Sequence, residues 1–572
     1  MSELAAEAKA EKPRFVRAFA ALKDRRMLAM LLLSFAAGLP YGAVLGTLNA
    51  WLTTEGITPS TIGILSIITL GYSFKYLWAP AFQTPKFVPF QRLGARRTWL
   101  LMFQVPMAAL LALLALTNPA ENIGFVAFLA LVIALMSATH DIVLDAWRIE
   151  VARSEEDKDI MAALYQFGYR LAGFITGFLA LLLAARLGWT TVYVLIGAMM
   201  VIAAIGTLIA PEPDEDINQD ENRPSFFSSM PATPRRISTV IVSIGWVIAA
   251  SMIVWFMTQA LILETNPSAR NFVRNQGPII VGLTVMMPAM IAAYLLYNFR
   301  PVAQTGVSGS EGGSISRALF RAIFDPLLDL IERMRWGVIL VLLLALTYRF
   351  TDAVWGAFAY PFYLDDRFGA LHHTMDDVAI ASKFFGVLMT IAGAALGAVV
   401  IAFIGRMPVL IIGAVLAAAT NLLFADLSAG GAGMDAFLAF TYLDGPLIAF
   451  AEWAAVISPD PVAPDQGQRM ARLMMAIAGE NLAGGFASVA IVAYLTSVVN
   501  PRFAAVQYAL LGSLTMLLGT LGRAWLGEMI EAEGYYSVFI ITFWLGMIAV
   551  ALCIIEAVRR AFAARDQELA PA

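Results

Sequence analysis

Apolar runs of about 20 residues recur along the whole chain, and they limit what it can fold into more than any other feature. About 20 residues of α-helix cross a hydrocarbon core that is about 30 Å thick. Of the 572 residues, 60% are hydrophobic and 14% are charged, whereas soluble domains carry about 25% charged residues. The sequence therefore predicts an all-α integral membrane protein.

Two polar stretches divide the apolar runs into three groups. The stretches are PEPDEDINQDENRPSFFSSMPATPRR at 211–236 and a segment that contains QTGVSGSEGGSIS at 304–316, and both have linker composition. Six predicted segments precede them, two lie between them and six follow. The segments are 27–52, 61–80, 98–117, 123–147, 161–184, 190–210, 237–263, 278–299, 335–363, 377–404, 407–425, 470–499, 504–530 and 535–558.

Residues 434–457 are also apolar, but acidic residues, Gly and Pro interrupt them. The placement of Lys and Arg decides how to count this stretch. If the N-terminus is cytoplasmic and the stretch does not cross, most of the 38 basic residues lie on the cytoplasmic side. We therefore predict about 14 transmembrane helices, both termini in the cytoplasm, and a re-entrant or surface hairpin at 434–457 on the periplasmic side.

Six plus six helices around a long middle loop match the major facilitator fold, in which two bundles rock about a central site. The predicted organisation has five parts. They are a basic cytoplasmic segment at 1–26, a six-helix bundle at 27–210, a linker with an extra helix pair at 211–334, a second six-helix bundle at 335–558 with a periplasmic insert at 426–469, and a cytoplasmic tail at 559–572.

Several classes of function are disfavoured by what the sequence lacks. One cysteine permits no disulfide framework, and three scattered histidines form no zinc motif. We find no Walker A pattern, so nothing indicates an ATP-driven pump. No nucleophile–base arrangement is present either. We therefore expect no enzyme activity, no bound cofactor and no nucleic-acid partner.

Charged residues lie inside several predicted spans, where an ionised side chain costs at least about 2.5–3.5 kcal/mol. They must therefore face the bundle interior, pair with each other or meet water. The stretch ATHDIVLDAWRIEV at 138–151 places Asp141, Asp145 and Arg148 on one helix face. We expect Asp145 to pair with Lys75, and Asp141 with Arg170. The alternative, that Asp145, Arg148 and Glu150 form only a structural clasp, stays open.

Small residues indicate close helix contacts. The stretches GFITGFLA at 173–180 and GAALGAVV at 393–400 carry Gly at helical spacing, which permits tight packing. Pro40 in the first segment is expected to break or bend its helix.

Five motifs in this order resemble the AmpG family of muropeptide permeases of Gram-negative bacteria. They are SFAAGLPYGAVLGTLNAWL at 34–52, GYSFKYLWAP at 71–80, HDIVLDAWRIEV at 140–151, GYRLAGFITGFLA at 168–180 and GENLAGG at 479–485. The resemblance covers roughly 27–210 and 335–558, and its wider family includes acetyl-CoA transporters. It implies a proton-coupled importer of N-acetylglucosaminyl-anhydro-N-acetylmuramyl peptides in the bacterial inner membrane. Such a protein recycles the cell wall and influences β-lactamase induction, and hence β-lactam resistance.

The chain departs from the family pattern in three ways. It has the extra helix pair between its halves, and it has the long insert at 426–469. It also carries Gln83 where the family usually has an acid, while LGARR at 93–97 still resembles the loop that latches the two halves.

Buried carboxylates take up and release protons near neutral pH, so acids within the spans are the candidates for proton coupling and gating. These candidates are Asp141, Asp145, Asp352 and Glu480. Substrate carboxylates suit basic residues, N-acetyl and hydroxyl groups suit amides, and sugar rings suit aromatic faces. The substrate-binding candidates are Lys75, Arg170, Arg349, Lys383, Asn49, Gln166, Tyr169, Asn481 and Gln507.

Two other functions stay open at this point. One is a facilitator with a different substrate, such as an acyl-CoA-like molecule, a peptide or a drug. The other is a non-transporting scaffold for envelope proteins, which would not need buried acid–base pairs. For the transporter we expect a monomer whose partners are the lipid bilayer and its small-molecule substrate.

Overall fold

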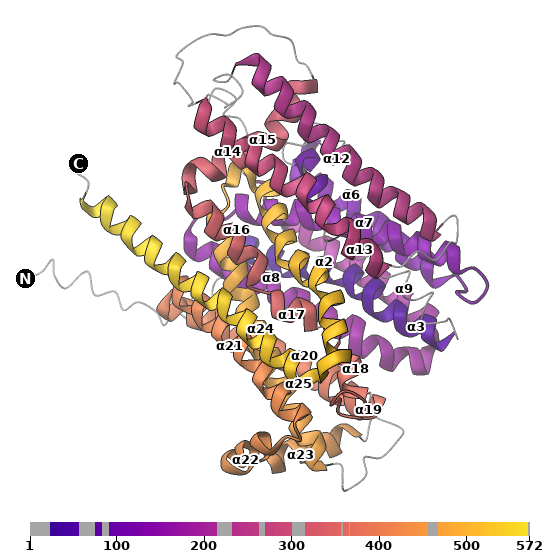
Figure 1. Cartoon of the computed structure of the whole chain (residues 1–572). Coiled ribbons are helices and arrows are strands. Elements are labelled where there is room, and N and C mark those ends of the chain that lie inside the picture. The colour runs from indigo at the N-terminus through magenta and orange to yellow at the C-terminus, as the bar shows by residue number, and fades with distance from the viewer. Residues whose placement is uncertain are drawn as a thin grey trace, which may run out of the picture.

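The computed structural model describes residues 23–55, 72, 75–82, 91–213, 231–261, 269–299, 315–355, 358–364, 366–455 and 467–569. All regular elements in these ranges are helices (Figure 1). The first part contains α2 (Arg25–Gly42), η1 (Ala43–Thr47), α3 (Leu48–Thr54), η3 (Lys75–Leu77), η4 (Ala79–Phe82), η5 (Gln91–Leu93), α6 (Ala95–Ala115), α7 (Ile123–Glu150), α8 (Glu155–Phe174), η6 (Ile175–Leu179) and α9 (Ala180–Ile209).

The middle and last parts continue the chain of helices. The middle part contains α12 (Ala232–Leu261), α13 (Ala269–Val281), η7 (Gly282–Met286), α14 (Met287–Asn298) and α15 (Ile315–Met334). The last part contains α16 (Gly337–Thr347), α17 (Phe350–Trp355), α18 (Ala359–Leu364), α19 (Met375–Val378), η8 (Ala379–Phe385), α20 (Gly386–Ile404), α21 (Arg406–Ser428), α22 (Ala432–Thr441), α23 (Asp444–Ala455), α24 (Gly467–Val498), η10 (Pro501–Phe503) and α25 (Ala504–Leu569).

Within the described ranges, nine helices are long and apolar enough to cross a membrane, or ten if the bent pair α22–α23 counts as one span. The all-α membrane fold predicted from the sequence is confirmed. The count of about 14 stays a prediction, and the predicted segment 61–80 lies mostly outside the described residues.

Four helix junctions share one unusual backbone conformation. Gly94, Gly188, Gly405 and Gly534 have φ of 85°, 78°, 83° and 81°, with ψ of 169°, 162°, 174° and 170°. Only glycine occupies this region readily. Each junction joins the second and third helix of a predicted group of three. The repetition indicates a three-helix unit that occurs four times, with α12–α14 inserted between the second and third unit.

Glycines bring α20 and α24 into backbone contact, as the sequence predicts for 393–400. A Cβ at Gly393 would lie 2.1 Å from the Leu482 carbonyl oxygen, and a Cβ at Gly485 would lie 2.1 Å from that of Thr390. At Gly173 and Gly177, nothing in the described part of the chain would lie within 4 Å of a Cβ, so the expected contact stays a prediction there.

The first span does not break at its proline. Helix α2 continues through Pro40 to Gly42 and then widens into the π-helical turn η1 before α3 begins. A π-helical turn shifts the register of the side chains and often lies at a functional site.

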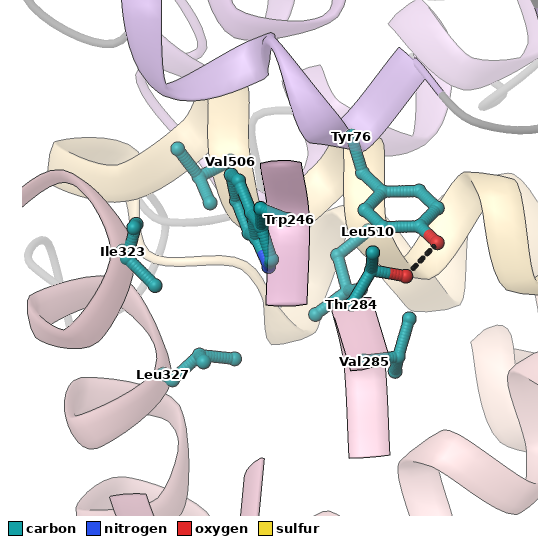
Figure 2. A pocket seen from close by; sticks show the side chains of 8 residues that line it. All are labelled: Tyr76, Trp246, Thr284, Val285, Ile323, Leu327, Val506 and Leu510. Atoms are coloured by element: carbon teal, nitrogen blue, oxygen red, sulfur yellow. Dashed lines mark hydrogen bonds between the residues drawn. The ribbon is translucent and has the colours of Figure 1, made fainter. Parts of the chain in front are cut away.

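The extra helices pack against both halves of the molecule. Figure 2 shows a small apolar pocket between α12, η7, α15 and α25, with Tyr76 from the first half at its edge. The Tyr76 hydroxyl and Thr284 Oγ1 are 2.6 Å apart. Helix α15 buries Phe320, Phe324 and Leu328 against α12 and α14. The sequence analysis missed α15, because its apolar residues alternate with charged ones and its N-terminal flank has linker composition.

Candidate functional site

The charged end of α7 lies inside the protein. Every residue from Ser137 to Glu150 is buried. Lys75 Nζ is 3.8 Å from Asp141 Oδ2 and 3.7 Å from Asp145 Oδ2, and Arg148 Nη2 is 3.2 Å from Asp145 Oδ1. Lys75 thus pairs with Asp145, as expected, and it also pairs with Asp141, for which we expected Arg170. We call these four residues the lysine cluster.

The lysine cluster joins the two halves through its arginine. The Arg148 guanidinium lies 5.1 Å from the ring centre of Tyr165 on α8 and 4.7 Å from that of Tyr508 on α25. Among the described residues, Asp141 Oδ1 and Arg148 Nε and Nη1 have no hydrogen-bond partner. The Arg148 guanidinium also interacts with the hydroxyl of Tyr508, so this side chain ties the cluster to the second half.

A second group of charges lies where the halves meet. Arg349 Nη2 is 3.1 Å from Asp352 Oδ2, and Arg349 Nη1 donates to Ser488 Oγ at 2.5 Å. Arg170, on α8 of the first half, interacts electrostatically with both Arg349 and Asp352. Its Nε has no hydrogen-bond partner among the described residues. Two guanidinium groups from opposite halves therefore face one region.

Glu480 extends this group along α24. It interacts electrostatically with Asp352 and Lys383. The next residue, Asn481, accepts a hydrogen bond from Thr390 Oγ1 at 2.7 Å, which fixes α24 against α20. We call this set the central cluster; its members are Arg170, Arg349, Lys383, Asp352 and Glu480. Within the described part of the chain, these members are three cationic side chains, which come from both halves, and two carboxylates.

Tyrosine rings line the first half beside Arg170. Tyr41 lies 5.0 Å from Tyr72 and 5.6 Å from Tyr169, and Tyr169 lies 6.0 Å from Tyr165, measured between ring centres. Tyr169 was predicted as a substrate contact, and the structure places it in this aromatic row.

At one end of the molecule, which we call the terminal end because α2 begins there, an ion-pair clasp joins the halves. Arg406, the first residue of α21, reaches Glu155 Oε2 at 2.6 Å and Asp159 Oδ1 at 2.5 Å, both on α8. We expected LGARR to supply this latch. Instead, Arg96 pairs with Glu150 at 2.5 Å and Arg97 donates to the backbone of α9, so both bind within the first half.

At the opposite end, aromatic side chains close the interface. The Phe384 ring centre lies 4.7 Å from Phe178 and 6.3 Å from Phe174 across the halves. It also lies 5.8 Å from Phe450 and 6.1 Å from Trp453 of α23. Along α8 and η6, Arg170 stands between the clasp residues and these phenylalanines. The central cluster therefore lies between two closures.

The remaining predicted residues lie elsewhere. Gln166 is buried on α8, and the side chain of Asn49 lies outside the described part. Gln507 donates to the Pro326 carbonyl oxygen at 2.8 Å and to Asp329 Oδ2 at 2.9 Å, so the structure places it in a network that joins α25 to α15.

Sequence reasoning missed Arg406, Phe384, Ser488 and Tyr508. Of these four, Arg406 could have been found from the sequence. It directly follows the junction glycine Gly405, just as Arg96 closely follows Gly94. The other three gain their roles from contacts between distant segments.

Known proteins that resemble this chain are named as a permease or as transporters. The anhydromuropeptide permease of Escherichia coli K12 is 42% identical over 195 residues, which are 34% of this chain and 38% of the permease. The match thus spans well under half of that relative. The putative transporter AmpG 4 of Rickettsia felis is 23% identical over 92% of this chain and 95% of its own length.

A solved structure also aligns with most of the chain. The proton:xylose symporter XylE aligns over 92% of this chain and 94% of its own at 12% identity, with a TM-score of 0.49. The sequence pattern of the Major Facilitator Superfamily matches residues 30–351. With its helical membrane fold, this match shows that the chain belongs to the Major Facilitator Superfamily.

Proposed function

We propose that this transporter imports anhydro-muropeptides, coupled to protons, from the periplasm into the cytoplasm across the bacterial inner membrane. The observation that carries the proposal is that Arg170 and Arg349, from opposite halves, lie close enough to interact electrostatically, in a region between two closures. An anionic substrate would pair with both guanidinium groups. The similarity to the E. coli anhydromuropeptide permease supports this choice of substrate.

Recognition of the substrate follows from the side chains around the cluster. Arg170 and Arg349 come from opposite halves, so one carboxylate bound between them would draw the halves together by charge-assisted hydrogen bonds. The row of Tyr41, Tyr169 and Tyr165 offers flat faces to the sugar rings.

Proton coupling is assigned to the buried carboxylates. Asp352 lies 3.1 Å from Arg349, and Glu480 interacts electrostatically with Lys383, so protonation of either carboxylate weakens the hold on its cation. Protonation of Asp141 leaves Lys75 paired with Asp145. Asp145 is held by two cations and serves as the fixed anchor of the lysine cluster. In this scheme the termini are cytoplasmic, and the Arg406 clasp is the inner gate.

The test is uptake of a labelled anhydro-muropeptide into proteoliposomes, with and without an imposed inward proton gradient. We expect accumulation only with the gradient, and its loss in Arg170→Gln and Arg349→Gln. The matched control is Arg97→Gln, because the Arg97 side chain donates to backbone carbonyl oxygens of α9 and belongs to neither cluster. Folded wild-type protein that takes up no muropeptide in either condition would refute the proposed substrate.

A further inference from the structure

Helices α22 and α23 form a hairpin that stands outside the helical bundle. Their axes meet at 97°, and Figure 1 shows the pair beyond the end of α21. Helix α21 begins at the clasp of the terminal end, so the hairpin lies at the opposite end.

The hairpin is held in place by its polar residues. Arg472 of α24 forms a two-pronged ion pair with Asp435, whose other contact is a hydrogen bond from Gln468 Nε2 at 2.9 Å. Asp426 caps the start of α22 by accepting from the backbone N–H of Gly433 and Met434 at 3.0 and 2.7 Å. These contacts orient the two helices and determine which face points outward.

The outward face of the hairpin is apolar. Phe440 and Tyr442 are each 82% exposed and Trp453 is 57% exposed, and Phe437 and Leu443 are exposed as well. Of the acidic residues in α22 and α23, Asp435 is neutralised by Arg472, Asp444 is partly buried and Glu452 is exposed. Exposed aromatic side chains gathered on two short helices indicate a contact surface.

We propose that this face lies in the lipid interface of the leaflet at the opposite end, with Phe437 and Phe440 among the upper acyl chains and Tyr442 at the headgroup level. The hairpin begins four residues after the end of α21, which itself exposes the apolar residues Ile412, Val415 and Leu422. Tyr and Trp are the residues that prefer the headgroup level of a bilayer, and an amphipathic helix lies flat there. The inference depends on the membrane fold and not on the substrate.

Spin labels test the position of the hairpin. The single cysteine is replaced first, by Cys553→Ala. A nitroxide is then attached in Phe440→Cys, and the protein is placed in lipid nanodiscs that hold one copy each. Collision rates with oxygen, which concentrates in lipid, and with a water-soluble nickel chelate give the depth of the label.

Two control sites calibrate the measurement. Ala120→Cys labels an exposed loop between α6 and α7, and Val415→Cys labels the exposed face of α21. We expect the ratio of the oxygen to the nickel collision rate to be several-fold higher at position 440 than at 120. At 440 the ratio should be lower than at 415.

A label at 440 that matches the label at 120 would overturn the proposal. The proposal would also be overturned if the label at 440 met water in single-copy nanodiscs but was buried in densely loaded vesicles. That result would assign the face to a second copy of the chain. Labelled protein that remains monodisperse and keeps the wild-type melting temperature shows that the result does not come from unfolding.

Discussion

Asp141 and Asp145 are one helical turn apart, but they contact different residues. Among the described residues, Asp145 binds two cations, Lys75 and Arg148, whereas Asp141 binds one, Lys75, and has one oxygen that accepts no hydrogen bond. Loss of one member of a buried pair is costly when it leaves a charge uncompensated.

We therefore predict that Asp145→Asn destabilises the protein by about 3 kcal/mol, since Arg148 loses its carboxylate. Asp141→Asn should cost only about 1 kcal/mol, since Lys75 keeps Asp145, yet it should abolish gradient-driven uptake. Thermal unfolding in detergent micelles measures the first effect, and proteoliposome uptake the second. Equal losses of stability in the two variants would contradict this division of roles.

The ion pair that holds the hairpin should persist at mildly acidic pH. Hydrogen bonds from Arg472 hold the pKa of Asp435 below its ordinary value of 3.8. A carboxylate with a lowered pKa keeps its contribution above the unfolded value and loses it only as the pH falls through the folded value, so nothing changes between about pH 5 and 8. Limited proteolysis of the hairpin should run at the same rate at both pH values and should accelerate in Asp435→Asn. Faster cleavage of the wild type at the lower pH would argue against the pair.

At the scale of helices, the cost of backbone strain can be predicted at a junction glycine where a new side chain would meet no neighbouring atom. No described atom lies within 4 Å of a Cβ at Gly188 or at Gly173, but Gly188 has φ of +78° and Gly173 lies within α8. Gly188→Ala should therefore destabilise the protein by about 1–3 kcal/mol through backbone strain alone. Gly173→Ala should leave stability unchanged or raise it by about 0.5–1 kcal/mol. The melting temperatures of the two variants in detergent measure these effects. A similar shift in both variants would refute backbone strain at Gly188.

Helical elements could be predicted where a run of apolar residues was long. The ends of α6, α21 and α24 follow such runs to within a few residues. Helix α15 could not be found in this way, because it lies along the protein and needs only one apolar face. The four glycine junctions were equally hidden, because a positive φ is not visible in a single glycine of the sequence.

At the scale of the whole molecule, the charges were predictable and their partners were not. The cost of charge in a membrane identified the residues of both clusters from the sequence. Which of them meet depends on how the halves dock: Asp141 pairs with Lys75, and Arg170 interacts electrostatically with Arg349 and Asp352 of the other half. The Arg406 clasp joins residues about 250 positions apart, a separation that no local pattern encodes.

The two closures predict opposite effects of two truncations. Phe384→Ala removes the aromatic contact between the halves at the opposite end, and Arg406→Ala removes the clasp at the terminal end. Transport by alternating access requires each end to open while the other stays shut. Each truncation should therefore shift the population toward opening at its own end.

Distances between pairs of spin labels can measure this shift. Labels at 187 and 367 report on the opposite end, and labels at 153 and 403 on the terminal end, since all four positions are exposed. Phe384→Ala should lengthen only the first distance and Arg406→Ala only the second. A change in both distances from one truncation would mean that the closures are not independent gates.

Helix α24 carries Arg472, which holds the hairpin, and Glu480, which belongs to the central cluster, about 12 Å apart on one continuous rod. A continuous helix can pass a displacement from one place to the other, and any linkage between two sites is reciprocal. If substrate in the central cluster draws α24 inward, the depth of the hairpin in the membrane changes. A lipid composition that changes the depth of the hairpin then changes the affinity of the cluster for substrate by the same factor. The composition of the surrounding lipid then acts as an effector of the transporter, without binding anywhere near its cargo.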